Sequence, residues 1–193
     1  MTVERPVEIA VYVAKRSRGR GDQRRAVIAA ALGIRADDVE FRVGERGRPD
    51  LAGVGGEPGA DGLVADVNLA HSGDLLLIAV VRGARVGVDV EKCRSRRFDA
   101  LARRVFSPVE HDAWSQATDR ERTFFTMWTR KEALTKATGR GLERLREITA
   151  TPCPPGWSII DLRVGDGYVA AVASPVTSVR VTLRQWPQVA STS

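Results

Sequence analysis

Two acidic residues, two positions apart, close a short apolar run in this chain. The run from Val86 to Glu91 (VGVDVE) is typical of a buried strand, whose two-residue period places Asp89 and Glu91 on one face. Converging carboxylates repel each other unless a cation lies between them, and their oxygens suit Mg²⁺, which shares its coordination with water and substrate phosphates. The pattern indicates a divalent-metal site, and the plainer alternative is a strand that runs into a solvated loop.

A helical stretch further along the chain adds charged candidates. Trp128, Glu132 and Lys136 are four residues apart and therefore share one face of a helix. If the Trp side chain packs inward, Glu132 and Lys136 point toward a cleft, where a charge needs a partner or a function. An ordinary ion pair between neighbouring turns of the helix is the alternative.

One of the two histidines lies in a segment of small residues, Asn68 to Gly73 (NLAHSG). Small neighbours allow the ring of His71 to approach a phosphate closely, whereas a histidine that only hydrogen-bonds a turn is the alternative. His111 lies in a polar stretch at a helix start, which indicates a surface position.

Composition limits the class of protein. The 193 residues are 43% apolar and 28% charged, enough for one large domain or two small halves with a buried core. The net charge of +6 favours an anionic partner. No apolar run is long enough to span a membrane, the first residues are unlike a signal peptide, and two cysteines make no disulfide framework, so we expect a cytoplasmic protein.

The elements that must position these residues form a mixed α+β order. Alternation and turn residues predict strands at 8–14, 75–81, 86–90, 157–164, 168–173 and 178–186. A helix should follow Asp22 as its N-cap and stop at Gly33, and a second should span 120–138 and stop at Gly139. Ser107, Pro108 and Glu110 have the spacing of a capping box at a helix start. The Gly-rich segment 52–62 is predicted to be a surface loop.

Five segments, taken together and in order, resemble the signatures of the Sfp-type 4'-phosphopantetheinyl transferases. They are Gly47-Arg48-Pro49, Asn68 to Ser72, Gly87 to Glu91, Phe106 to Glu110, and Trp128 to Leu142. The last segment matches a long pattern, Trp-x-x-Lys-Glu-x-x-x-Lys-x-x-Gly-x-Gly-Leu, and is therefore the most specific.

The resemblance implies a metal site of Asp89, Glu91 and Glu132, with Mg²⁺ as the ion, Mn²⁺ as an alternative, and the coenzyme A pyrophosphate completing its shell. It also implies that Glu132 is the base, directly or through water, and that the attacking group is a serine of an acyl or peptidyl carrier protein. The serine attacks the β-phosphate, and 3',5'-ADP leaves.

The resemblance implies further roles around this centre. Lys136, Glu110 and Lys131 are catalytic candidates. The coenzyme A contacts are expected from His71, Ser72, Lys136, Arg48, Arg20 and Arg24, with Arg48 in place of the family's lysine. Glu110 keeps its second interpretation as a capping residue. Ala70 replaces a serine of the family pattern, which removes a hydroxyl that could bind phosphate.

By the same resemblance, we expect a monomer made of two similar α+β halves in pseudo-twofold relation, residues 1–84 and 85–193, with coenzyme A in the cleft between them. Nucleic acid and membranes are not expected as partners.

Three competing hypotheses stay open. A nucleic-acid-binding protein would use the basic cluster from Lys15 to Arg25 but leaves the acids unexplained. A metal-dependent phosphodiesterase or nuclease would use the same carboxylates and deliver its product to water. A carrier-binding scaffold without activity would bind and not transfer, a hypothesis motivated by Ala70.

Overall fold

The structure is a computed structural model that describes residues 5–16, 23–43, 49–52, 64–95, 97–139 and 142–187. Its strands are β1 (Val7–Lys15), β2 (Glu40–Val43), β3 (Pro49–Ala52), β4 (Ala65–Ser72), β5 (Leu75–Arg82), β6 (Gly87–Lys92), β7 (Ser158–Leu162), β8 (Tyr168–Ser174) and β9 (Val179–Trp186). Its helices are α1 (Gln23–Leu32), α2 (Asp99–Val105), α3 (Pro108–Ser115) and α4 (Arg120–Thr138), with short 3₁₀ turns at Ala36–Asp38 and Leu142–Glu147.

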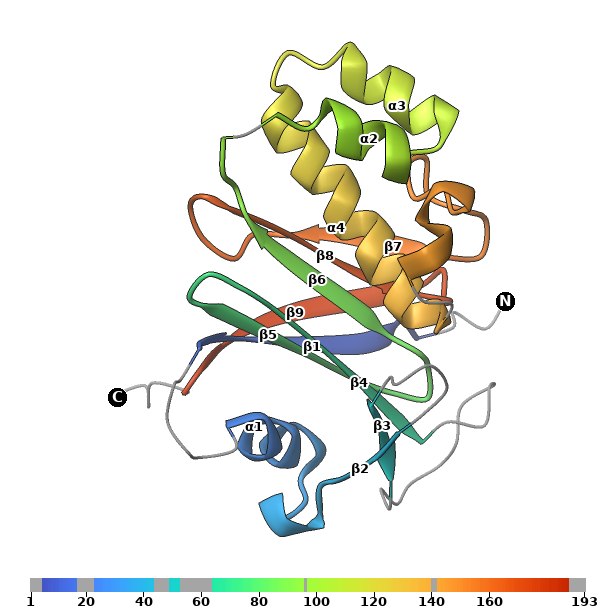
Figure 1. Ribbon diagram of the computed structural model, residues 1–193. Helices are drawn as coiled ribbons and strands as arrows, with labels where there is room; N and C mark the ends of the chain where they lie inside the picture. Colours follow the sequence, from blue (N-terminus) through green and yellow to red (C-terminus); the bar gives the residue numbers. More distant parts are fainter. Residues whose placement is uncertain are drawn as a thin grey trace.

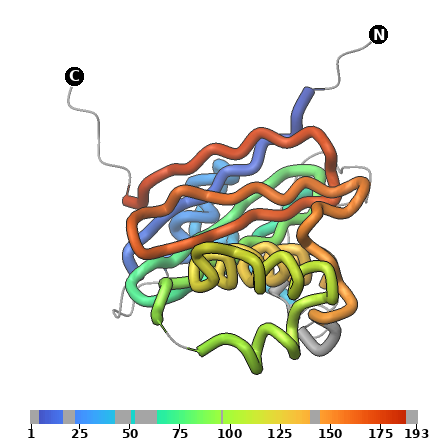
Figure 2. The backbone as a smooth tube through the Cα atoms, turned by 90° about the horizontal axis from the view of Figure 1, so that it is seen from above, coloured from blue at the N-terminus to red at the C-terminus, as the bar shows by residue number. Residues whose placement is uncertain are grey.

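The first sheet has four strands in the order β4-β5-β1-β9. β1 pairs antiparallel with β5, whereas β9 joins β1 in parallel, so the last described strand returns to the sheet that the first one began. Figure 2 shows β1 and β9, at opposite ends of the colour range, running side by side. The outer face of this sheet packs against α1 through Val27, Ile28 and Leu32. β2 and β3 form a separate antiparallel pair.

The second sheet has three antiparallel strands in the order β6-β8-β7. The long helix α4 covers its outer face, with α2 and α3 farther out (Figure 1). Alternate residues of β8 explain this packing, because Val169 joins the aromatic cluster under α4 while Ala170 and Val172 point the other way.

Between the two sheets lies a shared apolar core. It contains Val11 and Leu77 from the first sheet together with Val88 and Val172 from the second, all at most 1% exposed. Helix, sheet, sheet and helix layers therefore follow one another, as Figure 1 shows from α1 to α4. The residues of the candidate site lie where β6 meets α4 on one side and β4 on the other.

Local signals predicted several element ends correctly. Ser107 and Glu110 form the capping box of α3, with both reciprocal hydrogen bonds present, and Gly139 ends α4 in the left-handed conformation at φ 67°. Gly33 follows α1, also with positive φ. Asp22 and most of the 52–62 loop lie outside the described residues.

The α+β class is confirmed, but the sequence did not predict the strands β2, β3 and β4 or the helix α2. The pseudo-twofold relation and the division at residues 84 and 85 stay predictions. That division falls in the connection between β5 and β6, and β9, from the second part, pairs within the first sheet.

Candidate active site between β6 and α4

Gly87 brings β6 into direct contact with the backbone of α4. A Cβ atom at this position would lie 2.0 Å from the carbonyl oxygen of Ala133 and 2.6 Å from the backbone nitrogen of Ala137. Real Cβ atoms do not approach backbone atoms so closely, so any side chain would push strand and helix apart. Glycine at this position lets the following residues of β6 place their side chains against Glu132 and Lys136.

Asp89 lies in this contact and is 7% exposed. Its Oδ1 accepts a hydrogen bond from Lys136 Nζ at 2.8 Å, and the same ammonium donates to the carbonyl of Val88 at 3.1 Å. Asp89 Oδ2 is buried and has no hydrogen-bond partner among the described residues. Burial raises the pKa of Asp89 from 3.8 to about 6, although Lys136 lowers it; Glu91 raises it further.

Glu132 faces the same region from α4 and is 6% exposed. Burial raises its pKa from 4.5 to about 7, with a further contribution from the Asp89 carboxylate and a smaller one from Glu91, against the lowering effect of Lys136. The three acids therefore act on one another electrostatically. A carboxyl group with a pKa near neutrality is suited to accept a proton, and a neighbouring cation would favour its ionised form.

Glu91 is connected to the first sheet. Its Oε2 accepts a hydrogen bond from the Ser72 hydroxyl at 2.9 Å, and the oxygen of that hydroxyl accepts one from the backbone N–H of Lys92 at 3.0 Å. His71, next to Ser72, is exposed, and the alternation of β4 directs it to the opposite face of the strand. Ser72, and not His71, therefore touches one of the three acids.

Glu110 and Lys131 form a separate, fully buried pair. Both side chains are 0% exposed, and Lys131 Nζ lies 2.6 Å from Glu110 Oε2, which also accepts from Ser107 N. Lys131 Nζ donates as well to the Ile148 carbonyl. Burial lowers the pKa of Lys131, and the Glu110 carboxylate opposes this effect.

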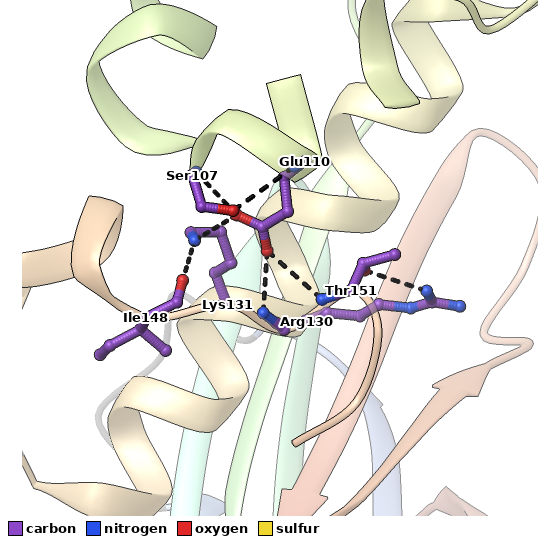
Figure 3. A network of polar contacts seen from close by, with 7 residues as sticks. Ser107, Glu110, Arg130, Lys131, Ile148 and Thr151 are labelled. Carbon is purple, nitrogen blue, oxygen red and sulfur yellow. Dashed lines mark hydrogen bonds and ion pairs between the residues drawn. The ribbon is translucent and has the colours of Figure 1, made fainter. Parts of the chain in front are cut away.

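The other oxygen of Glu110 binds the segment after the second 3₁₀ turn. Oε1 accepts from the backbone nitrogens of Ala150 at 2.8 Å and Thr151 at 3.3 Å (Figure 3). Glu110 thus joins α3, α4 and the 148–151 segment, and each of its oxygens already has two donors. Its catalytic role, and that of Lys131, stays a prediction.

The expected arginine contacts are only partly described. Arg24 is an exposed residue on α1, whereas Arg20 and Arg48 lie outside the described residues. Their roles stay predictions.

Tyr168 near the site was missed by the sequence reasoning. Its hydroxyl accepts from Asp74 N at 3.2 Å, and Gly73, at φ 55°, would bring a Cβ within 2.7 Å of that oxygen. Lys92 Nζ lies 5.8 Å from the centroid of the Tyr168 ring. The tyrosine therefore holds the turn after His71 and Ser72 against β8. No local pattern indicates this contact, because it joins residues 94 positions apart.

The donor chemistry of the site fits a hard cation. Among the described residues, Asp89 Oδ2 has no hydrogen-bond partner, and the neighbouring Glu91 carboxylate opposes the ionisation of Asp89. A bound Mg²⁺ would relieve both effects. Within the described residues, however, no three His, Cys, Asp or Glu side chains are already arranged to hold a metal ion. Lys136 Nζ instead lies 2.8 Å from the other oxygen of Asp89, Oδ1.

A comparison with known families identifies the family of this chain. The family model described as the 4'-phosphopantetheinyl transferase superfamily matches residues 85–185, more than half of the chain and the part that holds all three acids and Lys136. The chain belongs to the 4'-phosphopantetheinyl transferase superfamily. The resemblance found from the five segments is thereby confirmed.

Individual relatives agree with the family. The chain is 36% identical over 161 residues to the 4'-phosphopantetheinyl transferase HetI of Nostoc sp. (strain PCC 7120 / SAG 25.82 / UTEX 2576), which covers 77% of this chain and 66% of that protein. It is 32% identical over 140 residues to the 4'-phosphopantetheinyl transferase AcpT of Salmonella typhi, covering 70% of this chain and 67% of that protein.

A shorter match is the L-aminoadipate-semialdehyde dehydrogenase-phosphopantetheinyl transferase of Schizosaccharomyces pombe, 27% identical over 132 residues, with 62% of this chain and 50% of that protein covered. The matched part of the chain spans 66%, 67% and 50% of the length of these three relatives. In the part of the chain that the structure describes, no helix combines the length and apolar character that crossing a membrane requires.

Proposed function

We propose that this protein transfers the 4'-phosphopantetheine group of coenzyme A to a serine of an acyl or peptidyl carrier protein, with 3',5'-ADP as the second product. The observation that carries this proposal is the buried acid cluster at the β6–α4 contact, where Asp89 Oδ2 has no hydrogen-bond partner and Glu132 has a pKa of about 7. The family match over residues 85–185 supports the reaction class.

Asp89, Glu91 and Glu132 are the residues that would hold Mg²⁺, or Mn²⁺ in its place, together with the pyrophosphate of coenzyme A. When bound, the ion neutralises charge on the phosphates and orients them for displacement. Burial of Asp89 and Glu132 supports this assignment, since ionised carboxylates in such a place need a compensating charge.

Glu132 is the proton acceptor in this proposal. It takes the proton of the carrier serine, directly or through a water molecule, while the serine oxygen forms a bond to the β-phosphorus. The bond between that phosphorus and the bridging oxygen breaks, and the electron pair leaves with 3',5'-ADP. The pKa of about 7 belongs to the metal-free site. A bound cation would lower this pKa, so Glu132 would be ionised near neutral pH and able to accept the proton.

Lys136 supplies positive charge beside the same acids. Its ammonium lies 2.8 Å from Asp89 Oδ1, and it is 28% exposed, so it can also reach a phosphate oxygen that enters the site. Positioning and charge neutralisation are the main requirements of phosphoryl-group transfer. We further propose His71, Ser72, Arg48, Arg20 and Arg24 as contacts to coenzyme A, and Glu110 and Lys131 as further active-site members.

The remaining expectations belong to the same proposal. We propose that coenzyme A lies in a cleft between two related halves, that the protein acts as a monomer in the cytoplasm, and that its macromolecular partner is the carrier protein and no nucleic acid.

Intact-protein mass spectrometry tests this function. Apo-carrier protein is incubated with coenzyme A and Mg²⁺, and we expect the carrier to gain one phosphopantetheine group while 3',5'-ADP appears in equal amount. EDTA and Asp89→Asn should abolish the gain, whereas Asp112→Asn, an exposed acid on α3, should not.

Other outcomes would point to the competing functions. Release of 3',5'-ADP without a carrier would indicate a phosphodiesterase. Binding of coenzyme A without any transfer would indicate an inactive scaffold, and failure to bind coenzyme A would contradict the proposal altogether.

A further inference from the structure

Among the strands that the structure describes, none pairs with the edge of β6 that faces the first sheet. β6 is the terminal strand of its sheet, with β8 on one side, and β4 is the terminal strand of the other sheet. The two edges lie next to each other. A buried strand edge presents backbone N–H groups that each need an acceptor.

Side chains of β4 supply these acceptors. Asp66 Oδ2 accepts from Val86 N at 2.8 Å, and Asn68 Oδ1 accepts from Val88 N at 2.9 Å. Farther along the same edge, the Ser72 hydroxyl oxygen accepts from Lys92 N at 3.0 Å. In each pair the donor follows the acceptor by 20 positions, so the contacts form one regular register. We call these three contacts the β4–β6 seam.

The seam has one position without a hydrogen bond from β4. The register places Ala70 opposite Val90, whose N–H points toward β4 by the alternation of β6. Ala70 is 6% exposed and packs in the core between the sheets, and its methyl group offers no acceptor. A hydroxyl at position 70 would therefore lie opposite the Val90 N–H.

We propose that Asp66, Asn68 and Ser72 are positioning residues that hold β6 in register against the first sheet and thereby place the carboxylates of Asp89 and Glu91. This inference rests on the proposed function of those two acids. Asp66 and Asn68 are 2% and 6% exposed, so water cannot readily replace their hydrogen bonds. The Asn68 contact lies one residue before Asp89, and Ser72 also donates to Glu91 Oε2 at 2.9 Å.

Amide hydrogen exchange measured by NMR on the full chain tests the seam without reference to activity. Asn68→Leu keeps the approximate side-chain size but removes the acceptor. We expect exchange of the Val88 amide to become about tenfold faster, the usual effect of losing one buried hydrogen bond, while the Val86 amide changes less. Unchanged exchange at Val88 would overturn the inference.

The consequence for the site is tested with Mn²⁺ alone as the probe. Electron paramagnetic resonance should show binding about tenfold weaker for Asn68→Leu than for the wild type, because the acids are displaced. Ile28→Ala, a core change in α1, which packs on the far face of the first sheet, should lower the melting temperature and leave Mn²⁺ binding unchanged. Equal weakening in both variants would show that only general stability matters, which would contradict a positioning role.

A second variant covers the case in which Asn68→Leu fails to fold. Ala70→Ser adds an acceptor on β4 opposite Val90, whose backbone N–H otherwise interacts only with the Asp89 carboxylate among the described residues, and we expect the Val90 amide to exchange more slowly than in the wild type. Unaltered exchange at Val90 would contradict the register. The proposed function is tested separately. A wild-type protein that binds no Mn²⁺ and transfers nothing would contradict the proposed function, whereas the amide exchange rates would still report on the seam.

Discussion

Replacing Glu132 by Gln should stabilise the metal-free protein while removing its activity. Burial and two neighbouring acids raise the pKa of Glu132 from 4.5 to about 7 in the folded state. At about 1.4 kcal/mol for each tenfold change in proton affinity, ionising this carboxyl at pH 8 costs the folded state about 3 kcal/mol. A glutamine has almost the same shape and carries no charge.

The expected gain is smaller than this cost, because a buried amide also has polar atoms to satisfy, which offsets about 1 kcal/mol. A net gain of about 2 kcal/mol corresponds to a rise in melting temperature of about 4 to 8 °C for a chain of this size. The assay is thermal unfolding in EDTA at pH 8, with the exposed Asp112→Asn variant as the control that should not move.

The pH dependence of stability independently checks the sign of the stability change expected for Glu132→Gln. Between about pH 4 and 7 the folded state binds more protons than the unfolded state at Asp89 and Glu132, so the stability of the metal-free wild type should fall as pH rises. At pH 5, where Glu132 is protonated, Glu132→Gln and the wild type should melt within about 2 °C of each other. Mg²⁺ should stabilise the wild type and not the variant. A variant that melts at or below the wild type at pH 8 would refute the reasoning.

Two further predictions concern the packing around the site. Gly87→Ala should lower the stability by about 2 to 3 kcal/mol and abolish transfer, because its Cβ would lie 2.0 Å from the Ala133 carbonyl oxygen and must push β6 away from α4. Urea unfolding measures the loss of stability, and the carrier assay measures the loss of transfer. Wild-type activity in this variant would contradict the prediction. Lys131→Met should cost about 3 kcal/mol in urea unfolding, because it leaves Glu110 charged and buried without its cation, and a loss below about 0.5 kcal/mol would show that the pair is not needed for stability.

Local chemistry made part of this fold predictable. The capping box at Ser107 and Glu110 and the glycine stop at Gly139 were found because the residues that make these contacts are within a few positions of each other. The two-residue spacing of Asp89 and Glu91 predicted that both side chains lie on one face of a strand, for the same reason. Trp128, although expected as a core anchor, is only half-buried, and Phe124 stacks on it within the aromatic cluster.

Contacts between distant segments were not predictable in this way. The pairing of β9 with β1 joins the two ends of the described chain, and the residue pattern of neither strand indicates which strand it pairs with. Tyr168 and Ser72 act across the two sheets, so their roles depend on an arrangement that the sequence does not encode locally. Gly87 was noted as part of a strand, but its need for close contact with α4 became visible only with the helix in place.

The signals for β4 were present but weak. Ala65, Val67 and Leu69 face the core under α1, while Asp66, Asn68 and Ser72 face β6, an alternation in which the buried polar residues look like a solvent-exposed face.

The central claim is that Asp89, Glu91 and Glu132 hold one divalent cation at the β6–α4 contact. Titration of Mn²⁺ in the presence of coenzyme A, followed by electron paramagnetic resonance, measures this directly for the wild type, Asp89→Asn and the control Asp112→Asn. We predict one bound ion in the wild type and the control, and binding lost in Asp89→Asn. Equal Mn²⁺ binding by all three proteins would contradict the account.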